Sequence, residues 1–124
     1  MNFQVDLDGP LDIPLSVEGL RRWGDDLIDR WDGERLTRTI RIAGSAVPYV
    51  ASAIGNREVP ALTVVVTDPH HRSVIEHAVR SSFVIAPQAL EALERQDSAV
   101  ARLAAMFPGV RPFVQHDLLT ALVR

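Results

Sequence analysis

Residues 61–67, with the sequence ALTVVVT, contain three consecutive valines and no charged side chain. β-branched residues favour extended backbone, and apolar side chains on both faces suit a strand that lies inside a sheet. Pro60 precedes the run and Asp68-Pro69 follows it. Proline cannot donate a hydrogen bond to a neighbouring strand, and it suits the first turn of a helix. The run therefore predicts the innermost strand of a sheet, followed directly by a helix.

The composition favours one globular domain. The chain has 124 residues, of which 47% are hydrophobic and 23% are charged, as in folded proteins rather than disordered ones. No apolar run approaches the roughly 20 residues that span a bilayer. The acidic start, MNFQVDLDGPLDIP, lacks the basic region of a signal peptide. We therefore expect a cytoplasmic protein without a membrane partner.

The charged residues and the lack of cysteine exclude further classes. With no cysteine, the chain has no disulfide framework, thiolate nucleophile or zinc–thiolate site. The net charge is −3, so no overall basic field gathers nucleic acid. All thirteen basic residues are arginine, which indicates the codon usage of a GC-rich bacterial genome.

The residues before the valine run predict three strands and one helix. Residues 3–7 alternate apolar and polar side chains, as an edge strand does. Residues 35–42 and 46–54 read as two strands joined by a short turn, with Pro48 indicating a part that is unpaired or bulged. Between residues 7 and 35, residues 16–31 predict a helix of about four turns with Ser16 as its cap. Its apolar stripe comprises Val17, Leu20, Trp23, Leu27, Ile28 and Trp31.

The residues after the run read as helical. Helices are expected over residues 69–83, 87–95 and 97–107, with Asp68 and Asp97 as caps, and residues 113–124 form a last amphipathic stretch. Within the third of these helices, Val100, Leu103, Ala104 and Phe107 are expected to face inward. The predicted class is α+β: a mostly antiparallel sheet of four to five strands flanked by two helices and followed by short C-terminal helices.

Polar clusters offer weak candidates for chemistry. His70, His71, His77 and Glu76 lack the three- or four-residue spacing of helical metal ligands. His116 and Asp117 are adjacent, so they face different sides of a helix and cannot act as a base and its orienter. Asp6, Asp8 and Asp12 lack the glycine and distal glutamate of a calcium loop. Arg35, Arg38 and Arg41 are the best candidates for phosphate contacts, although Arg38 falls on the apolar face.

A resemblance adds what spacing alone does not show. The run AVARLAAMFPGVRPFVQHDLLTALVR, residues 99–124, resembles the linker and first domain helix of bacterial 3-methyladenine DNA glycosylases, the helix-hairpin-helix enzymes of alkylation repair. Residues 80–93, RSSFVIAPQALEAL, are similar to the end of the second helix in that family's N-terminal domain. The order of the motifs covers essentially the whole chain.

The resemblance implies a domain without chemistry of its own. Residues 1–107 would form the N-terminal α+β domain, which is similar to a half-repeat of the TATA-binding protein, and residues 108–124 would form a linker and a truncated first helix of the helical domain. The helix-hairpin-helix and the catalytic aspartate lie in that missing domain. We therefore expect no catalytic residue, metal or cofactor here, and no base excision by this chain alone.

The same resemblance implies the partners. A complete enzyme would bind damaged double-stranded DNA and flip an alkylated purine into an aromatic pocket, to which Trp23 is the residue that best corresponds. Without the helical domain, the apolar residues within 113–124 would dock on the sheet domain or mediate self-association. The alternative is a stand-alone interaction or small-ligand-binding domain without enzymatic activity.

Overall fold

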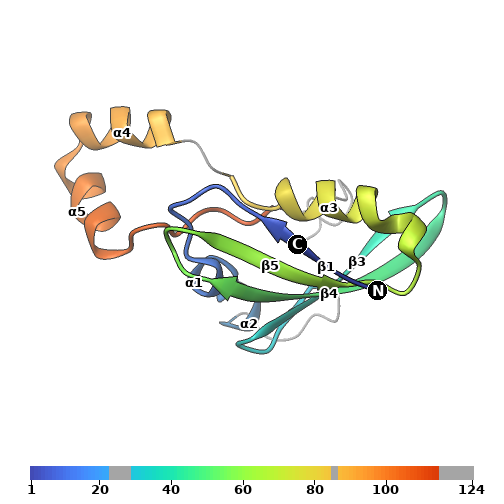
Figure 1. Ribbon diagram of the computed structural model, residues 1–124. Helices are drawn as coiled ribbons and strands as arrows, with labels where there is room; N and C mark the ends of the chain where they lie inside the picture. The colour runs from blue at the N-terminus through green and yellow to red at the C-terminus, as the bar shows by residue number, and fades with distance from the viewer. Residues whose placement is uncertain (23–28, 85–86, 115–124) are drawn as a thin grey trace.

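The computed structural model describes residues 1–22, 29–84 and 87–114 (Figure 1). Five strands form one antiparallel sheet in the order β1-β5-β4-β3-β2. They are β1 (Asn2–Asp6), β2 (Arg30–Trp31), β3 (Arg35–Ile42), β4 (Ser45–Gly55) and β5 (Pro60–Val65). The predicted α+β class is confirmed, and so are the edge position of β1 and the strand over residues 35–42.

The middle of the sheet is β4 and not the valine run. The prediction that residues 61–67 form the innermost strand is wrong by one position, although β5 is interior because β1 and β4 flank it. β4 has 11 residues, long enough to pair with β3 over residues 45–52 and with β5 over residues 50–55. Pro48 lies in the part of β4 that β5 does not pair with, which agrees with the predicted unpaired part.

Strand alternation gives the sheet one covered face. In β3, Leu36, Arg38 and Ile40 are buried, whereas the residues between them, Thr37 and Thr39, are exposed. The covered face continues across the sheet through register partners and includes Phe3, Val5, Val47, Tyr49, Ala51, Leu62 and Val64. These side chains form one hydrophobic core with residues from the helices, and the opposite face of β3 is open to solvent.

The helix over this face is the one predicted after the valine run. A short 3₁₀ turn, η1 (Pro69–His71), leads into α3 (Arg72–Arg80), and the Asp68 carboxylate accepts a hydrogen bond from the amide of His70. α3 runs along the sheet (Figure 1) and buries Ile75, Ala78 and Val79. Because these residues recur at three- and four-residue intervals, they share one face of the helix.

The predicted four-turn helix over residues 16–31 is wrong. The described residues of this region form two short helices, α1 (Ile13–Val17) and α2 (Gly19–Arg22), and residues 30–31 form a strand, whereas residues 23–28 lie outside the described ranges. The cap is Asp12, whose Oδ1 accepts a hydrogen bond from the amide of Leu15 at 3.1 Å, and not Ser16. Trp31 lies in β2, where it pairs with Leu36 of β3. A tryptophan at helical spacing is thus buried by strand pairing, because tertiary contacts outweigh local periodicity.

The last two described helices project from the sheet (Figure 1). α4 (Pro87–Gln96) and α5 (Ser98–Met106) contact chiefly each other, and Asp97 caps α5 as predicted. The expectation that Leu103 and Phe107 face inward is wrong, since they are 57% and 49% exposed. Neither helix contains a buried residue. Within the described ranges, no helix has the length and apolar content to span a bilayer.

Candidate functional site

A buried arginine lies on the covered face of the sheet. Arg38 occupies an inward position of β3 and is 2% exposed. Its guanidinium donates two hydrogen bonds to the Asp29 carboxylate, from Nε to Oδ1 at 2.7 Å and from Nη2 to Oδ2 at 3.3 Å. Asp29 is itself 3% exposed. The two opposite charges therefore compensate each other where both side chains are almost fully buried.

The same guanidinium reaches the end of α3 and the C-terminal part of the described chain. Arg38 Nη1 donates to Ser82 Oγ at 3.3 Å, and Nη2 donates to the carbonyl oxygen of Val114 at 3.0 Å. The guanidinium carbon lies 4.3 Å from the centre of the Phe113 ring, a cation–π distance. We refer to Asp29, Arg38, Ser82 and Phe113 as the Arg38 cluster. It joins segments that are far apart in the sequence.

Residues 112–114 are also held by the backbone. The Val114 amide donates to the Ser82 carbonyl at 2.8 Å, and the Val84 amide donates to the Pro112 carbonyl at 2.9 Å. The Phe113 ring meets the Phe83 ring edge to face, with centroids 5.4 Å apart. The chain that leaves α5 is thus fastened to the end of α3 like a short strand. These bonds fix the position and direction of the backbone at Val114.

Tyr49 is the buried hydroxyl beside this cluster. Its oxygen is enclosed and makes no hydrogen bond within the described structure. Burial raises the pKa of Tyr49, and the nearby charge of Arg38 offsets only part of that rise. The phenol therefore stays protonated at neutral pH and offers no nucleophilic oxygen.

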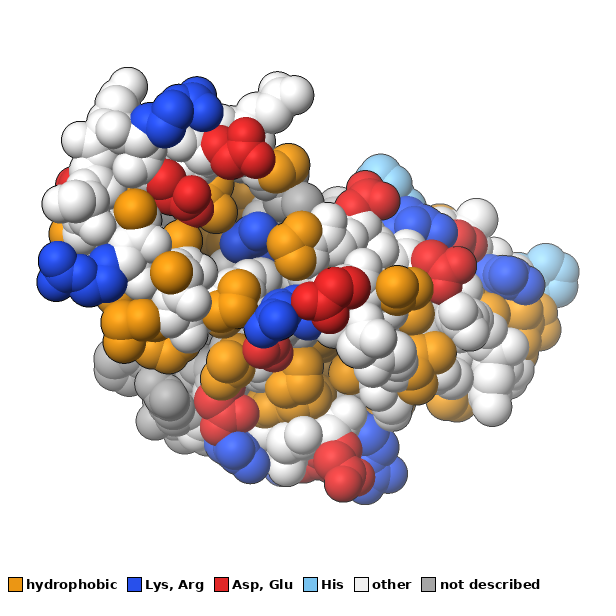
Figure 2. Space-filling view, turned by 60° about the vertical axis from the view of Figure 1, so that its left-hand side comes forward, with side chains coloured by type: hydrophobic (Ala, Val, Ile, Leu, Met, Phe, Trp, Pro, Cys, Tyr) orange, Lys and Arg blue, Asp and Glu red, His pale blue; other side chains and the backbone are white. Residues whose placement is uncertain are grey.

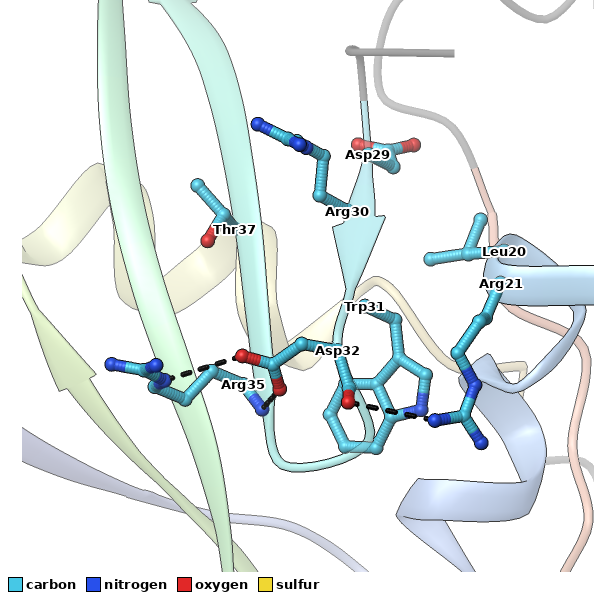
Figure 3. Close-up of a pocket in the computed structure, with 8 residues that line it drawn as sticks. All are labelled: Leu20, Arg21, Asp29, Arg30, Trp31, Asp32, Arg35 and Thr37. Carbon is cyan, nitrogen blue, oxygen red and sulfur yellow. Dashed lines mark hydrogen bonds and ion pairs between the residues drawn. The ribbon is translucent and has the colours of Figure 1, made fainter. Parts of the chain in front are cut away.

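A second site is a cavity of about 400 Å³ at the β2 edge of the sheet (Figure 3). Trp31 is one of the residues that line it, and its indole nitrogen donates to Glu18 Oε2 at 3.0 Å. Glu18 Oε1 accepts from Arg21 Nε at 2.8 Å. The walls also include Asp29, so the cavity borders the Arg38 cluster. Arg21, whose side chain is about half exposed, therefore forms an ion pair with Glu18 at the wall of the cavity.

Asp32 and Arg35, which also line this cavity, form another ion pair. Asp32 Oδ1 accepts from the amides of Glu34 and Arg35 at 2.8 and 2.7 Å, and the Arg35 side chain lies 3.4 Å from Oδ2. The backbone hydrogen bond from Arg35, then that from Glu34, lowers the pKa of Asp32. The carboxylate remains ionised and shapes the β2–β3 turn.

The structure separates the three arginines proposed for phosphate contact. Arg35 and Arg41 are exposed on the open face of β3, whereas Arg38 points into the core. The prediction of Arg38 on the apolar side is confirmed. Helical spacing places Asp29 on the solvent-exposed side of the predicted helix, but in the structure its side chain is buried. An arginine at an inward strand position is the signal that calls for a buried carboxylate, but the sequence does not say which one.

The other candidate site residues do not lie together in one place. The imidazole of His70 is exposed and lies 2.9 Å from Asp68 Oδ1. Asp12 caps α1, and Asp6 accepts from the side chain of Gln4. Across residues 1–22, 29–84 and 87–114, no three metal-binding side chains come together. Trp23, His116 and Asp117 lie outside the described residues, so the assignment of Trp23 to a substrate pocket stays a prediction.

Comparison with protein-family models, with curated proteins and with solved structures finds no match. The resemblance to DNA glycosylases accordingly stays a prediction from residues and their order.

Proposed function

We propose that this chain is the non-catalytic N-terminal domain of a cytoplasmic base-excision-repair DNA glycosylase that acts on alkylated purines. Its task would be to hold a helical catalytic domain, which binds damaged double-stranded DNA and removes the base. The proposal starts from the resemblance of residues 80–93 and 99–124 to that family. It assigns positioning to this domain and the chemistry to its partner domain.

The observation that carries the proposal is the anchoring of residues 112–114. The resemblance places the passage from the sheet domain to the helical domain at this point. Arg38, Ser82 and Val84 hold this segment through four contacts: two to the Val114 backbone, one to Pro112 and one to the Phe113 ring. A pocket formed between two domains needs a rigid connection, because small misplacements of reacting groups cost much of the rate. A buried charged cluster supplies such rigidity.

The sheet supports the proposal in a second way. The family resemblance implies a mostly antiparallel sheet flanked by two helices, and the structure has five antiparallel strands with α3 along the covered face. The buried groups Asp29, Arg38 and Tyr49 are occupied with one another or enclosed. These residues are suited to hold the fold together and not to attack a glycosidic bond.

Two measurements test the proposal. Release of methylated purines from alkylated duplex DNA is measured with the purified chain, and we expect none above the rate without protein. The coding sequence after Arg124 is then read for an in-frame helical domain with a helix-hairpin-helix and a later aspartate. Base release by this chain alone would contradict the proposal that the domain is non-catalytic. A downstream frame without such a domain would contradict the two-domain assignment.

The alternative function is small-ligand binding, and the cavity around Trp31 favours it. Its apolar wall comes from Leu20 and Trp31, and its polar wall comes from arginine and aspartate side chains. A ligand at 100 times its dissociation constant would stabilise the fold by about 2.7 kcal/mol. A thermal-shift screen with small carboxylates and phosphates would detect it, and Arg21→Gln should remove the shift. If no compound in the screen raises the melting temperature, the proposal of a non-catalytic glycosylase domain is the better one.

A further inference from the structure

The pair α4 and α5 carries several large apolar side chains that are exposed. Leu93, Leu103, Met106 and Phe107 are 48%, 57%, 62% and 49% exposed. A groove of about 520 Å³ runs between the two helices and the chain that follows them. Figure 2 shows hydrophobic side chains gathered around a hollow on this part of the molecule. Leu103 and Phe107 line the groove, and Glu94 and Arg111 carry its charges.

Two helices of this size need a partner to be stable. α4 has 10 residues and α5 has 9, below the roughly 12 to 15 residues at which isolated helices become even marginally stable in water. Most helical stability in proteins comes from packing an apolar face. Here the two helices contact chiefly each other and bury no residue. Their apolar face must therefore be covered by something other than the sheet.

We propose that a second copy of this chain covers it. Two α4–α5 pairs that face each other across a two-fold axis form a four-helix arrangement in which each pair covers the apolar face of the other. A two-fold interface uses the same patch twice, so the patch must complement itself. The groove meets this requirement because it carries one charge of each sign. Glu94 of one copy meets Arg111 of the other.

The groove is reached without rearranging the rest of the fold. The strands of the sheet and α3 lie away from α4 and α5 (Figure 1). The backbone beside the groove is fixed, because the Arg111 amide donates to Ser16 Oγ at 2.9 Å and the Asp12 amide donates to the Gly109 carbonyl at 2.7 Å. The surface presented to the second copy is therefore preformed along its Gly109–Arg111 side, which lowers the entropy lost on association.

The test is the mass of the 124-residue chain as its concentration changes. Sedimentation velocity from roughly 1 to 200 μM should show a monomer that converts to a dimer, as mass action requires. Leu103→Glu and Phe107→Glu should each raise the dissociation constant by at least roughly tenfold, since each places a charge in an apolar interface. Both side chains are half exposed in the single copy, so these variants should fold.

Two control substitutions and one charge reversal locate the interface. Val59→Glu changes an apolar residue that is 70% exposed in the β4–β5 turn and should leave the dimer intact. Leu118→Glu, in the C-terminal stretch for which the sequence predicts docking or self-association, should also leave it intact. Glu94→Arg should weaken the dimer, and adding Arg111→Glu should restore it, because the pair is then reversed rather than removed.

A monomer at all concentrations would overturn the proposal, whatever else covers the helices. So would a dimer that Leu118→Glu or Val59→Glu abolishes, or one that is indifferent to Leu103→Glu and Phe107→Glu. The mass is independent of base release, so failure here and failure of the glycosylase assignment are distinguishable.

Discussion

Arg38 and Asp29 form a two-point ion pair, 2.7 and 3.3 Å long, with both side chains almost fully buried. Removing two charges from water costs several kcal/mol per ion, and mutual attraction repays this cost only when the geometry is good and further hydrogen bonds are made. Ser82 Oγ and the Val114 carbonyl supply those bonds on the Arg38 side. The pair is therefore sensitive to any change that leaves one charge alone.

Arg38→Met should destabilise the fold by roughly 3–5 kcal/mol, because it removes the charge and the two hydrogen bonds that Arg38 supplies to the buried Asp29 carboxylate. The measurement is the free energy of unfolding in urea at pH 7. Arg41→Met is the matched control, since Arg41 lies on the same strand but on the open face; it should change stability by less than about 0.5 kcal/mol. Equal effects of the two substitutions would contradict the buried pair.

Combining Arg38→Met with Asp29→Leu should recover much of that loss. Replacing both members of a buried ion pair with apolar residues is often neutral or stabilising by about 1–4 kcal/mol. The double-mutant cycle therefore predicts strong coupling between the two positions. If the double variant is no more stable than Arg38→Met alone, the pair does not govern the stability of this face.

Phe113→Ala should release residues 112–114 from the end of α3. It removes the ring that contacts both Phe83 and the Arg38 guanidinium. Hydrogen exchange at the Val84 and Val114 amides should quicken by roughly tenfold or more, whereas the amides of the interior strands should keep their protection. Phe107→Ala, which alters an exposed phenylalanine at the end of α5, should change neither amide. Unchanged exchange in Phe113→Ala would show that the backbone bonds alone fasten the segment.

Tyr49→Phe should be close to neutral, or stabilising by about 0.5–1 kcal/mol, at pH 7, because it removes an enclosed hydroxyl that makes no hydrogen bond within the described structure. It should also reduce the loss of stability at high pH. The folded-state pKa of Tyr49 is raised above the ordinary value of about 10. At pH values below about 10 the hydroxyl is neutral, and this neutral form favours the folded state. That contribution disappears as the pH rises from there through the folded-state pKa. Urea titrations from pH 7 to about 11 check both statements. A loss of more than about 1.5 kcal/mol at pH 7 would reveal a partner for the hydroxyl.

Local patterns predict some elements well and others badly, for identifiable reasons. Residues 35–42 are recognisable as a strand because their alternation persists over eight residues, and Asp68-Pro69 is recognisable as a helix start because capping is local chemistry. Trp31 is assigned wrongly because its spacing from Leu27 and Ile28 fits a helix, whereas its pairing with Leu36 depends on a strand that comes later in the chain. Leu103 and Phe107 are predicted to face a core that the described fold does not provide.

The sequence alone determined the class of the fold, because strand alternation, proline positions and helix caps act within a few residues and need no knowledge of distant parts of the chain. It also marked Arg38 as the charged residue on an apolar face. Only the tertiary structure decided that Asp29 is its partner, that Phe113 and Val114 close the cluster, and that the described parts of the fold leave α4 and α5 largely exposed. Such contacts join segments up to 76 residues apart, and which of them form depends on how the whole chain excludes water from one face of the sheet.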